Sequence, residues 1–538
     1  MRISRIAFGS LVLAAACQAG GGDPGSGMTA ESLMGHIRVL SSDELEGRAP
    51  GSPGETRVVT YLTDQFQQLG LSPGNPDGTF VQQVPLVGIT PQPAGGLEVE
   101  RDGAAVTLEP GTDYVAFTKR VVETIDLEGE LVFVGYGAVA PEYDWDDFKD
   151  VDVTGKVLLM LVNDPPGPSI FGGRAMTYYG RWTYKFQSAA ARGAAGVFVI
   201  HETEPAGYPW DVIGSAPYGE QFDLVTEDRN MGRARVEGWI QRGATVRLFE
   251  LAGLDFEAAK RAATQRDFVP VPLGLTARTT IVNTLRTVDS QNVVARLQGT
   301  DAPDETVIYV AHWDHLGRDE SLSGDQIFNG AKDNASGTAA LLEIAAAFAR
   351  EAPPRRSVLF LAVTAEEQGL LGSRYYAGQP LYPTSQTVAA LNMDGLNVLG
   401  RTRDVTVVGM GQSSLDDLAA QLARDRARVL RPDPEPEKGF YYRSDHFEFA
   451  KVGIPAFNPD AGVEFLDKEE GWGLEMRERY TAEDYHQVSD EVKDYWDLSG
   501  AIDDLELLYE MGRDLATGQA WPEWSESSEF LAIRQADR

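Results

Sequence analysis

VIYVAHWDHLG, residues 307–317, joins a mostly apolar run to a polar group that begins at His312. The apolar run predicts a strand buried in a sheet. If the extended geometry continues past it, His312 and Asp314 point the same way, because side chains alternate along a strand. A carboxylate commonly orients an imidazole that binds a metal, although an ordinary polar strand end would contain the same residues.

Two further apolar runs end in acidic residues. Residues 358–363 precede Glu366 and Glu367, and residues 388–391 precede Asp394. Between these strands and after them, amphipathic patterns predict helices over residues 339–350, 415–428 and 498–515. We therefore predict an α/β fold with a mixed, mostly parallel sheet covered by helices on both faces. Sites in such folds lie beyond the carboxyl ends of the strands.

The remaining polar motifs stand in predicted loops. Asp333, in the loop 330–337, could cap the helix that follows or bridge two metals. Of the adjacent Glu366 and Glu367, one could bind metal while the other faces the substrate and moves protons; a solvated acidic loop is the alternative. Two later motifs bring Arg443, Asp445 and His446 in residues 443–446, and Tyr485 and His486 in residues 485–490.

Taken together, the motifs supply imidazole nitrogens and carboxylate oxygens but no thiolate. This donor set suits zinc. Two Zn²⁺ ions would be neutralised by three carboxylate ligands and one bridging hydroxide, a balance that a partly buried cleft tolerates.

Changes in composition and hydrophobic pattern along the chain predict four segments. Residues 1–27 read as a signal peptide and flexible tether, residues 28–114 as the first part of a catalytic domain, residues 115–275 as an inserted domain, and residues 276–538 as the main catalytic part. In the inserted segment, the aromatic residues Tyr178, Tyr179, Trp182 and Tyr184 could line a substrate entrance or pack in a core or interface.

The N-terminus predicts export. Arg2 and Arg5 precede an apolar run, residues 6–16, that is too short for a permanent membrane helix. Cys17 follows where cleavage would occur, which resembles a bacterial lipoprotein signal with a lipidated cysteine. We expect a membrane-anchored lipoprotein in the periplasm or on the cell surface; cleavage after Ala16 by an ordinary signal peptidase would instead give a periplasmic or secreted protein.

The 538-residue chain carries 47 basic and 81 acidic residues, for a formal charge of −34. Such acidity disfavours nucleic acid and anionic membrane surfaces as partners, so we expect contact with a membrane only through a lipid on Cys17. Since Cys17 is the only cysteine, no internal disulfide can form. The oligomeric state is left open by the sequence.

The six motifs, in this order, resemble the bacterial leucyl aminopeptidase, glutamate carboxypeptidase and glutaminyl cyclase family of di-zinc peptidases. The resemblance covers nearly all of the chain after residue 29, and it implies the zinc exopeptidase fold. The inserted segment resembles the β-rich α/β protease-associated domain of many members. A cis peptide bond after Asp333 is also implied.

The resemblance implies a role for each motif residue. Asp333 bridges two zinc ions and Glu366 is the general base, while Tyr485 donates a hydrogen bond to the oxyanion and Arg443 binds substrate. The remaining zinc ligands are His312 and Asp394 at one ion, and Glu367 and His486 at the other. Asp314, Asp445 and His446 contact the metal ligands rather than the metal ions. His446 stands in the more conspicuous motif, yet the family pattern points to His486 as the ligand.

These roles predict an exopeptidase, an aminopeptidase that releases N-terminal residues from peptide substrates. A carboxypeptidase of the glutamate carboxypeptidase type is the main alternative, and Arg443 is compatible with both. A glutaminyl cyclase is disfavoured because such enzymes use one zinc ion, and a non-catalytic binding protein is disfavoured by the intact set of ligands and base.

Overall fold

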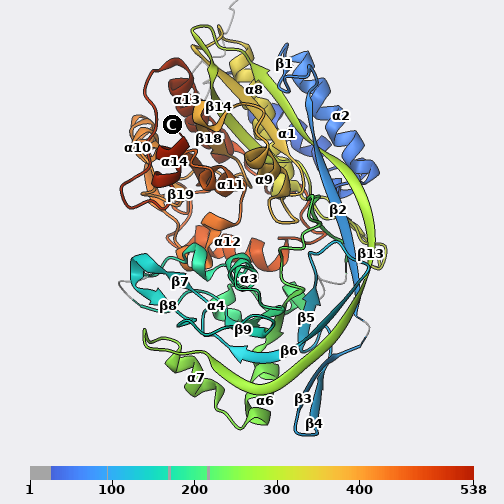
Figure 1. Ribbon diagram of the computed structural model, residues 1–538. Helices are drawn as coiled ribbons and strands as arrows, with labels where there is room; N and C mark the ends of the chain where they lie inside the picture. Colours follow the sequence, from blue (N-terminus) through green and yellow to red (C-terminus); the bar gives the residue numbers. More distant parts are fainter. Residues whose placement is uncertain (1–25, 94, 168–170, 172, 215–218, 538) are drawn as a thin grey trace, which may run out of the picture.

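The computed structural model describes residues 26–93, 95–167, 171, 173–214 and 219–537. The predicted signal peptide and Cys17 lie outside these residues. Figure 1 shows an upper body and a lower body, which β2 (Val81–Pro93) and the long strand β13 (Val271–Leu297) connect along one side. These two strands pair antiparallel with each other from Val81 and Val293 to Pro93 and Ile281.

The sheet of the upper body is built around β14 (Ala302–His312). On either side, β17 (Arg356–Val363) and β18 (Thr387–Asn392) run parallel to it, and β21 (Ala456–Asp460) runs parallel to β18. The last part of β13 pairs antiparallel with β17. The sheet is therefore mixed and mostly parallel at its centre, which confirms the prediction.

Both faces of this sheet are covered. Val307 and Tyr309 of β14 join the hydrophobic core beneath α1 (Ala30–Leu40), α2 (Pro53–Gln68), α8 (Gly337–Ala349) and α13 (Ser499–Thr517). Ile308 and Val310 point to the other face, where they join residues of α9 (Leu371–Gly378) and α11 (His446–Lys451). Alternation along one strand thus fills two separate cores, and this is why the run is apolar throughout.

Local capping sets the starts of the first two helices. The Thr29 side chain accepts a hydrogen bond from the backbone of Ser32, 3.1 Å away, and α1 begins at the residue after Thr29. α2 begins at Pro53, because Ser52 caps it and proline is well suited to the first helical position.

The lower body has cores of its own. Its central strands are β6 (Thr124–Phe133), β9 (Val157–Leu161), β10 (Gly196–His201), β12 (Val236–Gln241) and β5 (Tyr114–Phe117). One core also takes in Leu97 and Val99 of β3 (Leu97–Arg101), together with residues of β13 on both sides of residue 275. The lower body therefore draws on chain outside residues 115–275.

Helices α3 (Trp182–Ala191), α6 (Arg242–Ala252) and α7 (Phe256–Ala262) belong to the lower body. The remaining strands of three or more residues are β4 (Ala104–Leu108), β11 (Gln221–Leu224), β19 (Asp404–Val408) and β20 (Val429–Pro432), and the remaining α-helices are α4 (Thr203–Ala206), α5 (Asp211–Gly214), α10 (Leu415–Asp425), α12 (Trp472–Glu483) and α14 (Leu531–Asp537). Across the described residues, no helix combines the length and apolar character needed to span a bilayer.

The contact between α13 and β14 predicts a stability effect. A Cβ placed on Gly512 of α13 would lie 1.8 Å from the Tyr309 hydroxyl oxygen. Gly512→Ala should therefore lower the free energy of unfolding by about 1–3 kcal/mol through overpacking. Gly35→Ala is the matched control: this exposed site in α1 has no atom within 4 Å of the new Cβ. The control should raise stability by about 0.5–1 kcal/mol. Urea unfolding measures both, and equal effects would contradict the packing argument.

Candidate metal centre

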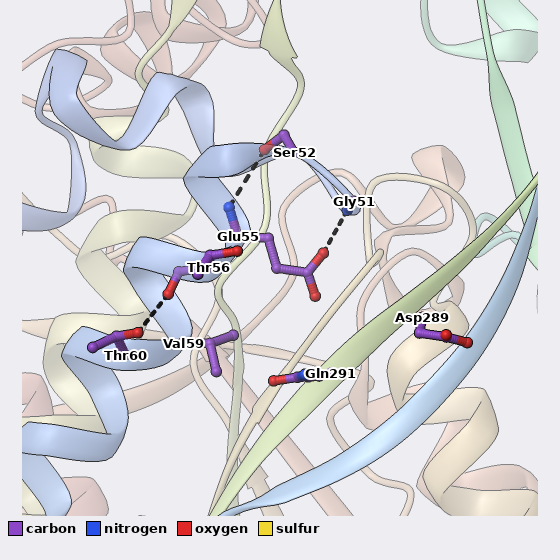
Figure 2. A pocket seen from close by; sticks show the side chains of 8 residues that line it. All are labelled: Gly51, Ser52, Glu55, Thr56, Val59, Thr60, Asp289 and Gln291. Atoms are coloured by element: carbon purple, nitrogen blue, oxygen red, sulfur yellow. Dashed lines mark hydrogen bonds between the residues drawn. The ribbon is translucent and has the colours of Figure 1, made fainter.

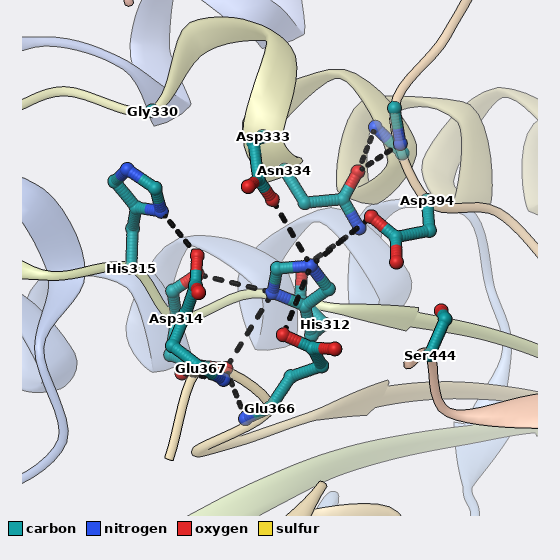
Figure 3. Close-up of polar contacts among 12 residues, drawn as sticks. His312, Asp314, His315, Gly330, Asp333, Asn334, Glu366, Glu367, Asp394 and Ser444 are labelled. Atoms are coloured by element: carbon teal, nitrogen blue, oxygen red, sulfur yellow. Dashed lines mark hydrogen bonds and ion pairs between the residues drawn. The ribbon is translucent and has the colours of Figure 1, made fainter. Parts of the chain in front are cut away.

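The polar motifs converge at the carboxyl ends of the central strands. His312 is the last residue of β14, Glu366 and Glu367 follow β17, and Asp394 follows β18. Asp333 lies in the turn that leads into α8. Figure 3 shows these side chains pointing toward one another, so a parallel sheet does bring together the motifs that are far apart in the sequence.

The predicted ligands form two groups that share Asp333. Nε2 of His312 lies 3.3 Å from one Asp333 oxygen and 3.4 Å from an Asp394 oxygen. Nε2 of His486 lies 3.3 Å from the other Asp333 oxygen and 2.9 Å from a Glu367 oxygen. Asp333 therefore faces both imidazoles, one through each carboxylate oxygen.

A further histidine lies at the second group. Nδ1 of His315 lies 2.6 Å from the other Glu367 oxygen. One atom each of His315, Asp333 and Glu367 lie within 4.8 Å of one another, as do those of His312, Asp333 and Asp394. His315 is thus a neighbour of the site that its motif alone did not assign, because nothing in the sequence shows that it reaches Glu367.

The Asp314 carboxylate links its own motif to the motif that contains Glu366 and Glu367. Its carboxylate lies 3.7 Å from Nδ1 of His312 and accepts hydrogen bonds from the backbone of Glu366 at 3.0 Å and of Glu367 at 3.4 Å. The residue is fully buried. The carboxylate predicted to orient His312 therefore also holds the loop that carries both glutamates.

Asp490 holds the turn of Asp333 in the same way. Its two carboxylate oxygens accept the backbone N–H groups of Lys332 at 3.1 Å and Asp333 at 3.0 Å, and the Tyr480 hydroxyl lies 3.2 Å away. The Asp333–Asn334 peptide bond is cis, as the resemblance implies. The motif at residues 485–490 does not by itself reveal this role of Asp490, because the backbone groups that it binds lie about 160 residues earlier in the chain.

Electrostatics separate the two adjacent glutamates. Burial raises the pKa of Glu366 well above its usual value, and Asp394 and Glu367 add to the rise. Burial and Asp333 also act to raise the pKa of Glu367, but His486 and His315 bring it down to about 2. One glutamate therefore holds a proton readily while the other stays ionised, a division typical of a base beside a ligand.

The other predicted residues lie around the cluster. The ring of Tyr485, 42% exposed, stacks on His486 with centroids 3.8 Å apart. Buried Asp445 accepts a hydrogen bond from Ser373 at 2.6 Å rather than from a predicted ligand. His446 packs edge-on against Tyr441, and burial lowers its pKa to about 3.

Arg443 lies at the edge of the lower body. Its guanidinium carbon is 5.2 Å from the Phe440 ring centre and 5.9 Å from that of Tyr208. Tyr178 packs against Tyr442 and Phe447 of the upper body, so one of the singled-out aromatic residues stands at this interface.

A separate cavity of about 290 Å³ lies between α2 and β13 (Figure 2). It is lined by Gly51, Ser52, Glu55, Thr56, Val59, Thr60, Asp289 and Gln291. The Glu55 carboxylate is already engaged by the Gly51 backbone and by Ser290, and none of the six motifs reaches the cavity. We therefore assign the chemistry to the strand ends and not to this hollow.

The imidazole nitrogens and carboxylate oxygens of the cluster are suited to bind divalent metal ions. Carboxylates outnumber imidazoles in a buried space, an arrangement that is costly unless cations neutralise it. Nε2 of His486 is buried and makes no hydrogen bond of good geometry within the described residues, although carboxylate oxygens surround it. Nitrogen and oxygen donors of this kind are those that zinc takes in catalytic sites.

The comparisons with known proteins agree with this geometry. The model of peptidase family M28 matches residues 292–508, the stretch that contains all six motifs. A probable zinc metalloprotease of Leptosphaeria maculans is 35% identical over 103 residues, 19% of this chain and 23% of that protein. Aminopeptidase NAALADL1 of Rattus norvegicus is 34% identical over 129 residues, 23% of this chain and 16% of that protein. The chain thus spans less than a quarter of either curated relative.

The fold is shared over a longer stretch. The aminopeptidase from Aneurinibacillus sp. strain AM-1 superposes with a TM-score of 0.52 at 20% identity, covering 92% of this chain and 95% of that one. This likeness confirms the predicted fold, and the family match confirms the predicted resemblance. By its motifs, its strand-end cluster and its match over residues 292–508, the chain is similar to peptidase family M28 over the part that carries the site.

Proposed function

We propose that the protein is a di-zinc aminopeptidase that releases N-terminal residues from peptides. The observation that carries this proposal is the pair of ligand groups that share Asp333, with a Glu366 oxygen 3.9 Å from Nε2 of His312. The match to a peptidase family over residues 292–508 and local similarity to a named aminopeptidase and to probable zinc metalloproteases support it.

The proposed ligands are those that the geometry brings together. Asp333 faces both sites, with His312 and Asp394 on one side and Glu367 and His486 on the other. When bound, two zinc ions would lower the pKa of a shared water and polarise the scissile carbonyl.

Glu366 is the proposed general base. An oxygen of its carboxylate lies 3.9 Å from Nε2 of His312. Other carboxylates lie closer to the His312 and His486 imidazoles. The raised pKa of Glu366 suits a group that takes a proton from the attacking water and passes it to the leaving amine. Tyr485, above His486, is the proposed donor to the oxyanion.

We also propose that the chain is exported and lipid-anchored through Cys17. The support is the charged start, the short apolar run and the position of the cysteine in the sequence. The lower body, with strands and helices around its own cores, is proposed to be a protease-associated domain that shapes the cleft.

Substrate panels test the activity. Purified protein should hydrolyse aminoacyl p-nitroanilides and leave acyl-blocked peptides intact; the reverse preference would identify a carboxypeptidase. Glu366→Gln should lower kcat by at least about 10²-fold, because it removes the base. Its zinc content should match that of the unmodified protein, and near-normal turnover would contradict the assignment of Glu366.

Metal analysis tests the choice between His486 and His446. His486→Ala should lose more zinc than His446→Ala, because His486 lies within 4 Å of the carboxylates of Asp333 and Glu367, whereas His446 makes no such contact among the described residues. Mass spectrometry of dialysed protein gives zinc per chain. A larger loss in the His446 variant would place the second ion elsewhere.

Labelling with radioactive palmitate in a bacterial host tests the anchor. The full chain should incorporate label and sediment with membranes, whereas Cys17→Ser should do neither, because only a thiol accepts the lipid. Absence of label from the full chain would show simple secretion.

A further inference from the structure

The residue directly before Glu366 has a backbone conformation that its side chain disfavours. Ala365 has a φ angle of 52°, and Leu370 has one of 60°. Glycine adopts this left-handed region without steric cost, whereas the Cβ of alanine or leucine crowds the backbone there. Residues 364–370, which we call the glutamate loop, therefore contain strained backbone on either side of the two glutamates. Strain of this kind persists only where surrounding contacts determine it.

One set of such contacts comes from the upper body. The Asp314 carboxylate accepts the backbone N–H groups of Glu366 at 3.0 Å and Glu367 at 3.4 Å. The Leu371 N–H donates to the Ala365 carbonyl at 3.0 Å. These bonds fix the backbone of the loop, but the Ala365 methyl group has its contacts elsewhere.

Strand β11 of the lower body meets the same loop with one residue. Phe222 is 5% exposed and shares an apolar core with Ala365 and Leu371. Its N–H donates to the Gln368 side chain at 3.2 Å, and its carbonyl accepts Nζ of Lys119 at 3.0 Å. Phe222 is therefore bound to the glutamate loop on one side and to the lower body on the other.

The next residue of β11 reaches the end of the loop through an ion pair. The Asp223 side chain is 6% exposed and pairs with Arg374 of α9, the helix that follows the loop. It also lies 3.5 Å from Arg233, which Glu237 holds with hydrogen bonds of 2.9 and 2.7 Å. The Arg374 N–H donates to the Leu370 carbonyl at 2.8 Å. The contacts thus run from the lower body to the second strained residue.

The position of β11 in the sheet makes it a firm support. The strand pairs antiparallel with β2, where Phe222 stands opposite Gly88 and Asp223 opposite Val87. β2 in turn pairs with β13, the long strand that joins the two bodies. A strand that belongs to a sheet positions its neighbours more exactly than a free loop does.

We propose that Phe222 and Asp223 are positioning residues for the proposed reaction, because they keep the glutamate loop in its strained conformation and thereby place Glu366. This role rests on the proposed peptidase function, and it makes the rate of the chemical step depend on the lower body. Neither residue is a proposed ligand or catalytic group, so each acts through the loop. A displacement of about 1 Å at a catalytic group is enough to cost about 10²-fold in rate.

Kinetics of zinc-saturated protein test this role from both sides of the ion pair. Asp223→Asn and Arg374→Met should each lower kcat for an aminoacyl p-nitroanilide by at least about 10-fold, with KM within about 2-fold, because the transition state depends on the base more than substrate binding does. The double variant should lose no more than either single variant, since all three lack the same contact. Normal kcat in both single variants would overturn the proposal.

Asp113→Asn is the matched control. The Asp113 side chain is 15% exposed and lies 2.8 Å from Arg247, so this variant weakens an ion pair that stays within the lower body. Its kcat should remain within about 2-fold of the unmodified value, the range of a change remote from the site. A loss equal to that of Asp223→Asn would show a general effect on the lower body and overturn the proposal.

Glycine at residue 365 separates positioning from a loss of stability. Because glycine adopts a φ angle of 52° without strain, the loop then needs less support. In an Ala365→Gly background, the effect of Asp223→Asn on kcat should shrink to within about 3-fold, and Phe222→Leu should respond in the same way. An undiminished loss in that background would contradict the role of β11 in opposing strain.

Hydrogen exchange followed by mass spectrometry reads the loop without turnover. Amides of residues 364–372 should exchange at least about 10-fold faster in Asp223→Asn than in Asp113→Asn or the unmodified protein, because their local opening becomes easier. Hydrolysis by the unmodified protein, with exchange and kcat unchanged in the variants, would leave the peptidase standing and remove the positioning role. Faster exchange in a protein that hydrolyses no peptide would leave the hold on the loop and remove the peptidase.

Discussion

The constraint on which the structure depends is a concentration of buried negative charge at the end of one sheet. Asp314, Asp333 and Glu367 are each buried or nearly so, and they lie within a few ångströms of His312 and His486. Water cannot solvate such a group of carboxylates, and mutual repulsion would drive protons onto them. Imidazoles and divalent cations are the partners that keep them ionised, and the surrounding fold keeps those partners in place.

Two buried carboxylates hold the backbone of the loops that carry the proposed ligands. The Asp314 carboxylate binds the N–H groups of the two glutamates, and the Asp490 carboxylate binds those of Lys332 and Asp333. Each of these acids therefore ties a loop after one strand to a loop from another part of the chain. The ligands need little freedom of their own, because the loops that carry them are fixed by hydrogen bonds to charged acceptors.

The lower body is joined to this site as well as to the sheet. Phe222 N–H of β11 donates to the Gln368 side chain at 3.2 Å, directly after the two glutamates, and Asp223 pairs with Arg374 of α9. Contacts of this kind hold the lower body against the loop that carries the two glutamates.

The sequence by itself determined the buried strands, their alternation with helices and the order of the polar motifs. Runs such as residues 307–311 are apolar at every position because both faces of β14 are covered, and α1 begins where Thr29 caps it. Only the tertiary structure decided which motif residues meet. His315 reaches Glu367, whereas His446 turns toward Tyr441, although both stand in conspicuous motifs. Likewise, Asp490 finds its backbone partners more than a hundred residues away in the chain. The local sequence pattern indicates burial and helix capping, because both depend on residues that are close in the sequence. The pairing of charged side chains depends on distances between remote residues, which only the folded chain sets.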